Sequence, residues 1–440
     1  MGRRKNESSV SADGQTQLGI VPEEEWPYDL PEGWRWVRLG DVVDVNPPKI
    51  RPDDLNEPVS FVPMASVSEV SGSISCREAK TAIDVISGFT SFRDGDVLFA
   101  KIKPCMENGK AAIASNLING IGYGSTEFYV LRPSNIVDRH WVYYYVRSQT
   151  FRDEAKQNMS GAVGQQRVPK TFIVNHFFPL PPLSIQQHII ARIESLFAKL
   201  DEAKSLAQSA LDSFETRKAA ILHKAFTGEL TAKWREENGI SDQSWQHVTL
   251  KDVCTGFQYG TSQKSQKTGK VPVIRMGNLQ NGVIEWDNLA YTDNVEDIIK
   301  YALHRDDILF NRTNSPELVG KTSIYKNEMP AIFAGYLIRI NYIKSIIDGE
   351  FLNYLLNSNK AKIYCLSVKT DGVNQSNINA QKLAQFTFNK PKLSEQKEIT
   401  KMLDSLFSKE QTAQKIVEDV LTQIDLMKKS ILNRAVRGKL

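Results

Sequence analysis

Two segments of the chain carry apolar residues at alternating steps of three and four positions, which is the spacing of a helix that buries one face. In the first segment this stripe consists of Ile193, Leu196, Leu200, Ala203, Ala207, Ala210, Phe214 and Ile221. In the second it consists of Leu403, Leu406, Ala413, Val417, Val420, Ile424, Met427 and Ile431. A serine that can cap a helix opens each segment and a glycine closes it. The pattern predicts two long helices, within residues 181–230 and 391–440.

The two helical segments are copies of one another. The segment that ends at Leu230 aligns without a gap with the one that ends at Leu440, at an offset of 210 residues. The matched positions include Leu183/Leu393, Ser184/Ser394, Gln186/Gln396, Phe197/Phe407, Ile221/Ile431 and Gly228/Gly438. A period near 210 residues is too long for a solenoid, so the chain contains a duplicated pair of domains, a pseudo-two-fold internal repeat.

The regions before the two helical segments are related more faintly, at nearly the same offset. The corresponding positions include Trp34 and Trp245, GDVLFAKIKPCMENGK (95–110) and DDILFNRTNSPELVGK (306–321), Val163 and Val373, and Gln165 and Gln375. Both regions, 34–180 and 245–390, alternate short β-rich runs with helical stretches, which predicts an α+β domain in each. We expect the remaining residues to form a partly disordered N-terminal leader, 1–33, and a linker, 231–244.

Each predicted helix is far longer than the average of about 11–12 residues in globular proteins. Packing of each helix on its own domain is one interpretation, and we favour the other, in which the two helices pair with each other. In that pairing the small residues Ala203, Ala207 and Ala210 would face larger ones of the second helix. The pair would separate the two α+β domains.

The composition excludes several classes of protein. The 440 residues are 41% hydrophobic and 24% charged, as in ordinary globular chains. No apolar run approaches the roughly 18 to 20 residues of a membrane-spanning helix, and no secretory signal follows the basic start. The four cysteines, Cys76, Cys105, Cys254 and Cys365, are far apart, which argues against a disulfide scaffold or a zinc site. We therefore expect a cytoplasmic protein without membrane contact.

The distribution of charge is more informative than the net charge of +4. Acidic residues are absent between Glu154 and Glu194 and between Asp252 and Glu285, where basic and glutamine residues occur. Lysine and arginine can neutralise phosphates, and glutamine can read the edge of adenine. Together with basic residues of the matched segments 95–110 and 306–321, these give the candidate DNA-binding residues Lys101, Lys103, Lys110, Gln165, Gln166, Arg167, Lys170, Lys264, Lys267, Lys270, Arg275, Arg312 and Lys321. A solvated basic loop is the alternative for each loop taken alone.

Motifs for catalysis are weak. Asn46-Pro47-Pro48-Lys49 resembles the Asn-Pro-Pro-aromatic loop of amino-methyltransferases, but the aromatic residue is replaced by lysine and no glycine-rich turn is present to hold S-adenosylmethionine. Asp53, Glu78 and Lys80 imitate the carboxylates and lysine of a nuclease, yet Glu-Ala-Lys also occurs at 154–156 and 202–204. No GxxxxGK[ST] loop is present. We predict no catalytic residue and no metal site.

The whole layout resembles the specificity (S) subunit of type I restriction-modification systems, the HsdS family, over nearly the full length. The junction PLPPLSIQQHII (179–190) is similar to the family signature Pro-Pro-Leu-x-Glu-Gln-x-x-Ile, and GQQRV (164–168) and KAAILHKAFTGELT (218–231) also look like family sequence. Ile185 replaces the usual glutamate, which the second copy keeps as Glu395, and Pro182 is replaced there by Lys392.

This resemblance implies a non-catalytic subunit with two target recognition domains, each of which reads half of a bipartite sequence in double-stranded DNA. The helices would form an antiparallel coiled coil that sets the spacer between the half-sites. Two modification subunits would bind S-adenosylmethionine and methylate adenine at N6, and two restriction subunits would use ATP and Mg²⁺, so this chain itself would hold no cofactor. The alternatives are a single-chain DNA methyltransferase or nuclease with its own recognition domains, and a coiled-coil scaffold.

Overall fold

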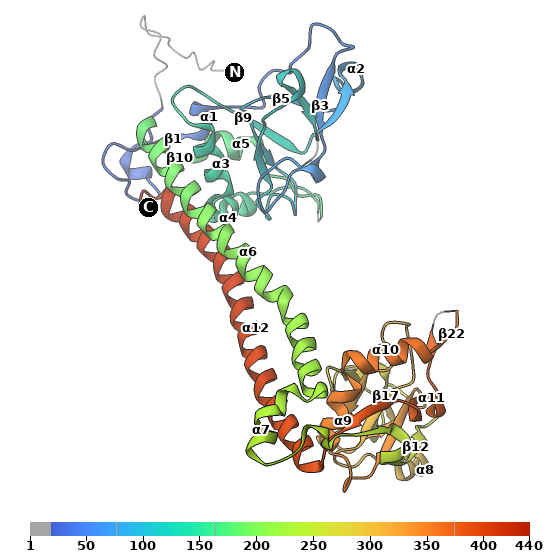
Figure 1. The fold of residues 1–440 in the computed structure, drawn as a ribbon. Helices are drawn as coiled ribbons and strands as arrows, with labels where there is room; N and C mark the ends of the chain where they lie inside the picture. The colour runs from blue at the N-terminus through green and yellow to red at the C-terminus, as the bar shows by residue number, and fades with distance from the viewer. Residues whose placement is uncertain (1–18, 76, 163, 374) are drawn as a thin grey trace, which may run out of the picture. The chain divides into compact units, whose positions relative to one another are not determined.

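The computed structural model of the chain describes residues 19–75, 77–162, 164–373 and 375–440. Residues 1–18 of the predicted leader, Cys76 and Val163 lie outside the described residues. By its internal contacts the chain divides into two units: unit 1 comprises Met1–Ala207 and Asp419–Leu440, and unit 2 comprises Gln208–Glu418. Each unit contains one of the predicted α+β regions and a part of both long helices (Figure 1).

Within its described residues, unit 1 contains three sheets. An antiparallel pair joins β1 (Arg35–Arg38) and β10 (Phe177–Leu180). One four-stranded sheet has the order β2 (Val43–Val45), β9 (Phe128–Pro133), β6 (Val97–Ala100), β7 (Ala111–Ile113), and the other β4 (Glu78–Thr81), β3 (Pro58–Val62), β8 (Ile121–Gly124), β5 (Thr90–Arg93). The helices of its α+β region are α1 (Leu39–Val42), α2 (Ala82–Val85), α3 (Arg139–Arg147), α4 (Gln149–Gln157) and α5 (Lys170–Asn175).

Unit 2 repeats much of this plan. The antiparallel pair is β11 (Gln246–Thr249) with β24 (Thr387–Lys390), and the four-stranded sheet has the order β12 (Cys254–Tyr259), β21 (Leu337–Tyr342), β17 (Ile308–Asn311), β19 (Thr322–Ile324). Smaller sheets have the orders β16 (Ala290–Thr292), β13 (Val271–Ile274), β20 (Ile332–Phe333); β14 (Leu279–Gln280), β15 (Val283–Ile284); and β18 (Thr313–Asn314), β23 (Ser376–Asn377), β22 (Thr370–Asp371). The shorter helices are α7 (Ala232–Glu237), α8 (Val295–Lys300), α9 (Gly349–Leu356), α10 (Asn359–Val368) and α11 (Ala380–Ala384).

Short 3-10 turns connect these elements. They are η1 (Glu23–Glu25), η2 (Met64–Ser66), η3 (Ile118–Gly120), η4 (Glu229–Thr231), η5 (Asp242–Ser244), η6 (Leu250–Val253) and η7 (Met276–Asn278). The α+β fold class and the internal repeat predicted from the sequence are confirmed.

A central strand buried on both faces explains the longest apolar β-runs. In β6, Val97 and Phe99 belong to the core cluster that faces the helices, whereas Leu98 belongs to a second cluster on the opposite face. In β17, Phe310 belongs to one core cluster and Leu309 to another on the opposite face. A strand covered on both sides needs an apolar residue at every position, which is why these runs do not alternate.

The two long helices occupy the predicted segments: they are α6 (Leu183–Thr227) and α12 (Leu393–Val436). Within unit 1, Lys204 Nζ donates to Asp425 Oδ1 at 2.9 Å, and Lys428 pairs with Asp201. The residue number rises along α6 as it falls along α12. The two helices therefore run antiparallel in unit 1.

Unit 2 contains the other halves of α6 and α12. Arg217 Nε donates to Glu410 Oε2 at 3.0 Å. Thr231, just beyond the end of α6, contacts Glu395 near the start of α12. The order is again opposite, so the pairing is antiparallel in this unit as well.

Near the middle of the helix pair, the residues buried between the two helices differ from the predicted apolar stripe. Four of the predicted seam residues are exposed: Ala203, Ala413, Val420 and Met427. Lys204 and Lys428, each next to one of them, are half-buried instead. Their aliphatic stems cover the seam while their ammonium groups reach aspartates of the facing helix. A pattern that scores lysine as polar cannot find such positions.

One buried glutamine fixes each helix to its domain. Gln186 Nε2 donates to Ile136 O at 3.1 Å and to Pro181 O at 2.8 Å, and its Oε1 accepts from Asp138 N at 2.8 Å. Asp138 is the N-cap of α3, so the amide ties the start of α6 to the start of α3. Gln396 repeats these bonds in unit 2 with Ile346 O at 3.1 Å, Pro391 O at 2.9 Å and Asp348 N at 2.8 Å.

The change from Pro182 to Lys392 does not alter the start of the helix. Gln186 N donates to Pro182 O and Gln396 N donates to Lys392 O, both at 3.0 Å. The side chains of Pro182 and Lys392 are exposed, so only their backbone carbonyls matter here.

In unit 1 the end of α12 packs against residues near the start of the chain. Tyr28 Oη donates to Val436 O at 3.1 Å, and the Arg437 guanidinium lies 5.2 Å from the centre of the Tyr28 ring. Gly438 has φ +64°, and a Cβ there would lie 3.3 Å from Trp34 Cζ2. The C-terminus accordingly lies beside β1 and β10 in Figure 1.

In unit 2 the linker after α6 takes the equivalent place. Gly228 has φ +88° and packs against Trp245 as Gly438 packs against Trp34. The fully buried Glu395 accepts hydrogen bonds from Thr231 Oγ1 at 2.7 Å, Arg235 Nη1 at 2.8 Å and Trp245 Nε1 at 3.1 Å. Ile185, its counterpart in unit 1, is 41% exposed. The departure from the family signature at Ile185 therefore removes this anchor from unit 1.

Replacing Gln186 with leucine should lower the free energy of unfolding by about 2 kcal/mol or more, because a buried N–H and two carbonyls lose their partner. Urea denaturation followed by tryptophan fluorescence measures this change. The matched control is Gln187→Leu at the exposed neighbouring position, which we expect to stay within about 0.5 kcal/mol of the unchanged protein. Equal effects of the two substitutions would show that the amide does not hold the helix.

Candidate nucleic-acid interface

Each unit presents a hairpin at an equivalent position, next to the segment that follows the central strand of the four-stranded sheet, β6 in unit 1 and β17 in unit 2. In unit 2, β22 and β23 form hairpin 2 (residues 370–377), and β23 pairs with β18. In unit 1, hairpin 1 (residues 160–167) pairs with the segment after β6 through Lys103 N to Gln166 O at 3.0 Å and Val168 N to Lys101 O at 2.9 Å. The repeat thus places the same three-segment ribbon in both units.

The tip of hairpin 1 presents its glutamines. Gly161 and Gly164 have φ of +119° and +83°, which favours glycine at both positions. Gln165 N donates to Ala162 O at 2.9 Å and closes the turn. The Gln165 side chain is exposed and that of Gln166 is half-buried. These amides are therefore carried on a closed, hydrogen-bonded turn.

The predicted residues of unit 1 divide into two groups. Lys101, Lys103, Gln165, Gln166 and Arg167 lie together on the ribbon, and Lys170 follows at the start of α5. Lys110 is not part of the ribbon: its carbonyl accepts from Ala100 N at the end of β6 at 3.0 Å, and its Nζ donates to Met64 O at 3.3 Å.

Two of the predicted ribbon cations already have partners within the chain. Lys103 Nζ is 3.7 Å from Glu107 Oε1, and the Arg167 guanidinium is bonded to Glu127. Lys101 Nζ lies 5.2 Å from the centre of the Tyr129 ring. The surface charge that the sequence assigned to DNA is therefore partly neutralised internally.

In unit 2 the predicted residues are more dispersed. Arg312 lies on the ribbon, where its Nη2 donates to Asn377 Oδ1 at 3.2 Å and its guanidinium lies 4.8 Å from the Tyr259 ring. Lys321 Nζ donates to Gln280 Oε1 at 2.7 Å, and Arg275 Nη2 donates to the Asn288 carbonyl. These three cations contribute to the internal structure.

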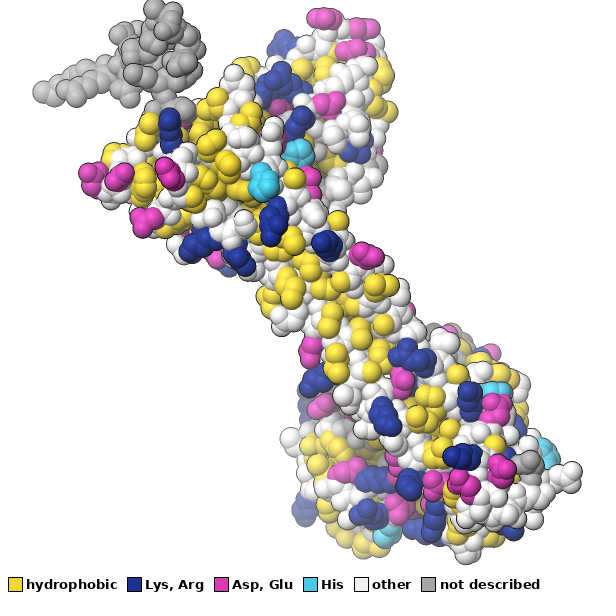
Figure 2. Space-filling view, turned by 60° about the vertical axis from the view of Figure 1, so that its left-hand side comes forward, with side chains coloured by type: hydrophobic (Ala, Val, Ile, Leu, Met, Phe, Trp, Pro, Cys, Tyr) yellow, Lys and Arg dark blue, Asp and Glu magenta, His cyan; other side chains and the backbone are white. Residues whose placement is uncertain are grey.

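A separate loop of unit 2 carries the remaining predicted lysines, Lys264, Lys267 and Lys270. All three side chains are exposed. The loop is tied to the sheet by the backbone bridge between Gln266 and Tyr291 and by the bond from Lys270 N to Asp293 Oδ1 at 2.9 Å. Figure 2 shows Lys and Arg side chains interspersed with Asp and Glu on the face in view.

Hairpin 2 contains candidate residues that the sequence-based selection omitted. Val373 at its tip is fully exposed, and Gln375 is exposed beside it. Ser376 Oγ donates to Asp371, which also pairs with Lys369. In the sequence, these residues are marked by the match of Val163 and Gln165 with Val373 and Gln375, and not by charge.

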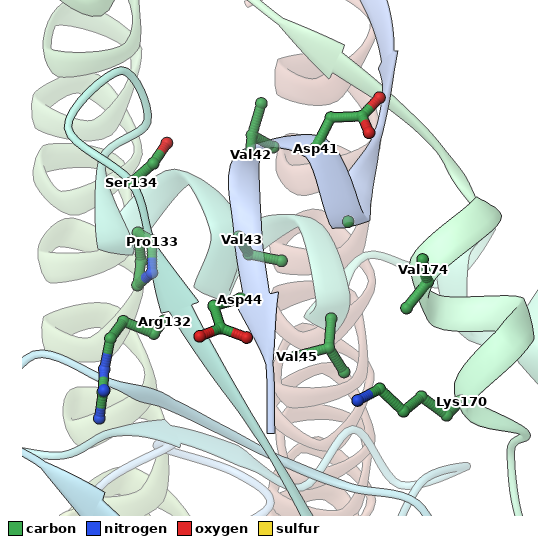
Figure 3. A pocket seen from close by; sticks show the side chains of 11 residues that line it. Asp41, Val42, Val43, Asp44, Val45, Arg132, Pro133, Ser134, Lys170 and Val174 are labelled. Atoms are coloured by element: carbon green, nitrogen blue, oxygen red, sulfur yellow. The ribbon is translucent and has the colours of Figure 1, made fainter. Parts of the chain in front are cut away.

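A shallow pocket recurs beside β2 and β12. In unit 1 it has a volume of about 540 Å³ and lies between β2, the end of β9 and α5. Figure 3 shows Arg132 and Lys170 on either side of β2, with Asp44 between them. The pocket of unit 2, of about 790 Å³, is lined by Cys254 among others. Burial raises the pKa of the Cys254 thiol to about 12, so it is not a nucleophile at neutral pH.

The weak catalytic motifs have structural roles. Asn46 Oδ1 accepts from Val130 N at 3.0 Å, so this amide holds a turn against β9. Lys80 pairs with Glu78 at 3.6 Å and lies 3.9 Å from the centre of the Phe61 ring. Among the described residues, no three His, Cys, Asp or Glu side chains form a group that could hold a metal ion.

Two further properties concern the whole described chain. The described cysteines, Cys105, Cys254 and Cys365, are free thiols. No helix within the described ranges combines the length and apolarity that crossing a membrane requires.

Comparison with known proteins agrees with this architecture. Residues 31–208 and 242–421 each match the family described as "Type I restriction modification DNA specificity domain". The chain is 38% identical over 225 residues to the EcoAI specificity subunit of a type I restriction enzyme from Escherichia coli. That alignment covers 50% of this chain and 38% of the relative, well under two thirds of its length.

Solved structures show the same fold. A structure described as the basis of complex assembly and conformational transition of the type I R-M system superposes with a TM-score of 0.73 at 21% identity, over 94% of this chain and 100% of that one. The HsdS subunit from Thermoanaerobacter tengcongensis superposes with a TM-score of 0.67, also at 21% identity and with the same shares covered. With two matching domains in tandem, the chain belongs to the family of type I restriction-modification DNA specificity domains.

Proposed function

We propose that this chain is the DNA sequence-recognition subunit of a type I restriction-modification complex and is itself non-catalytic. The observation that carries the proposal is the repeat of one exposed hairpin at the same place in two units of this family. Each unit would read one half of a bipartite target. The pairing of α6 with α12 would set the spacer between the two halves.

The chemistry of the hairpins suits contact with double-stranded DNA. The exposed amides of Gln165 and Gln375 each offer a donor and an acceptor, the pair of groups that matches the N6 and N7 edge of adenine in the major groove. The exposed Lys264, Lys267 and Lys270 can neutralise phosphates and release counterions. Base contacts would supply sequence preference and phosphate contacts would supply affinity.

The proposed partners are two modification subunits and two restriction subunits, in the cytoplasm. The modification subunits would carry S-adenosylmethionine and methylate adenine at N6, and the restriction subunits would carry ATP and Mg²⁺. This division is supported by the names of the relatives, which are specificity subunits of restriction enzymes. Both long helices leave large apolar side chains exposed, among them Leu206, Ile416, Leu426 and Met427. Yellow side chains along the helices in Figure 2 show such surface, which we assign to docking of partner subunits.

Co-expression of the chain with its modification subunit, followed by genome-wide mapping of N6-methyladenine, tests the proposal directly. We expect one bipartite motif with a constant spacer, and no methylation when either subunit is omitted. Methyl transfer by the purified chain alone would instead establish a single-chain methyltransferase. The absence of any methylation motif, together with no binding in gel shifts at moderate salt, would favour a scaffold.

Reversing the charge of Lys264, Lys267 and Lys270 to glutamate should weaken DNA binding for all sequences. The slope of log K against log salt should become shallower by about 0.9 for each phosphate that the loop no longer neutralises. Fluorescence anisotropy over a salt series measures both quantities. The control is the reversal of three exposed lysines of α12, Lys397, Lys409 and Lys415, which should leave the slope of the original chain unchanged. If the reversal of Lys264, Lys267 and Lys270 also leaves the slope unchanged, the loop is not part of the interface.

Inserting seven residues into both helices at the border between the units tests the spacer. The sites are after Ala207 in α6 and after Glu418 in α12, which leave the residues of each unit intact. Seven helical residues add about 10 Å, equivalent to about three base pairs. Methylation mapping should show the same half-sites with a spacer about three base pairs longer. Altered half-sites, or an unchanged spacer, would contradict the assignment.

A further inference from the structure

Arg167, which the sequence predicts to contact DNA, forms hydrogen bonds within unit 1. Its Nε donates to Glu127 Oε1 at 3.1 Å and Oε2 at 2.9 Å, and its Nη2 donates to Glu127 Oε1 at 2.8 Å. Its Nη1 donates to Gln165 O at 2.7 Å. The guanidinium thus links the body of the unit to the residue at the tip of hairpin 1.

The backbone of the same residue is held from both sides. Arg167 exchanges two backbone hydrogen bonds with Ser160 across the hairpin, and Ile102 forms a bridge with it from the segment after β6. Glu127 is fixed in turn, because its carbonyl accepts from Lys101 N at 2.9 Å. The ion pair therefore joins two segments whose backbones are already in register.

The charge of this arginine is balanced at close range. Hydrogen bonds from Arg167 hold the pKa of the Glu127 carboxyl below its ordinary value, so the pair is ionised at neutral pH. A phosphate contact would require Arg167 to release a bidentate carboxylate, which is the kind of partner that suits a guanidinium best. The side chain of Gln165, by contrast, is exposed.

The second unit ties the equivalent position by other groups. Asn377 stands where the repeat has Arg167; its Oδ1 accepts from Arg312 Nη2 at 3.2 Å and its Nδ2 donates to Thr313 Oγ1 at 2.8 Å. An asparagine cannot form a carboxylate–guanidinium pair, yet the residue at the base of the hairpin is again fixed to the neighbouring segment. Both units therefore fix the residue at the base of the hairpin, unit 1 by a carboxylate–guanidinium pair and unit 2 by the hydrogen bonds of Asn377.

We propose that the Glu127–Arg167 pair positions hairpin 1 so that Gln165 and Gln166 read the bases of one half-site, and that Arg167 is a positioning residue and not a phosphate contact. This inference rests on the proposed DNA-recognition function. It makes the two glutamines the specificity-determining residues of unit 1.

The test uses the full chain and two duplexes, one with the mapped target and one of unrelated sequence, with affinities measured over a salt series. Arg167→Gln and Glu127→Gln should each weaken binding to the target by about tenfold or more, which is the scale of a single bidentate interaction with a base. Binding to the unrelated duplex and the salt slope should stay unchanged. The charge exchange Glu127→Arg with Arg167→Glu should recover part of the target preference.

Glu127→Gln separates the two interpretations, because it leaves the arginine charged and less strongly paired. If Arg167 contacts phosphate, this substitution will raise affinity for both duplexes and steepen the salt slope, and the proposal is then wrong. The matched control removes the exposed pair on β4 with Glu78→Gln, which we expect to change neither quantity.

Folding and function are checked separately. Circular dichroism and thermal unfolding of each variant identify a folding defect, and Gln165→Ala with Gln166→Ala provides a second route, since it should lower target preference while the ion pair stays intact. Preserved target preference in that double variant would overturn the assignment of the glutamines. Failure of the unaltered chain to distinguish the two duplexes would contradict the proposed function itself.

Discussion

The structure depends on the burial of one face of each long helix, which neither helix can achieve alone. Helices in proteins draw most of their stability from the packing of an amphipathic face. Here α6 and α12 supply that packing to one another within each unit, and the α+β region of the unit covers their ends. Ile189, Ile190 and Ile193 of α6 join the same core cluster as Leu432 and Val436 of α12. The first unit therefore contains residues from both ends of the chain.

Polar groups then fix the position that apolar packing leaves adjustable. An apolar seam tolerates sliding and rotation, whereas a buried amide with three partners in fixed places does not. Gln186 and Gln396 satisfy the same three backbone groups in their respective units, which locates the start of each long helix against the helix that follows the sheet. Glu395 adds a second buried anchor in unit 2, where three donors compensate its charge.

The two hairpins differ in side chains although equivalent ribbons carry them. Backbone hydrogen bonds hold together the ribbon that carries each hairpin. Side-chain contacts at its base differ between the units, with Glu127–Arg167 in unit 1 and Arg312–Asn377 in unit 2. The side chains at the tips are free to differ: hairpin 1 offers Gln165 and Gln166, and hairpin 2 offers Val373 and Gln375. A difference of this kind between two equivalent tips is what reading two different half-sites would require.

The sequence by itself determined the duplication, the extent of the two long helices and the α+β class, because apolar periodicity and ungapped repetition are local properties of the chain. It also predicted contacts by Gln165, Gln166 and the lysines near 264–270, and the structure leaves these lysines and Gln165 exposed. Only the tertiary structure decided which charged side chains have partners within the chain and which remain free to contact another molecule. Arg167, Lys110 and Lys321 all carry charge in the sequence, but their partners, Glu127, Met64 O and Gln280, lie at least 40 residues away along the chain. Composition cannot show such pairings, because they depend on which segments the sheets bring together.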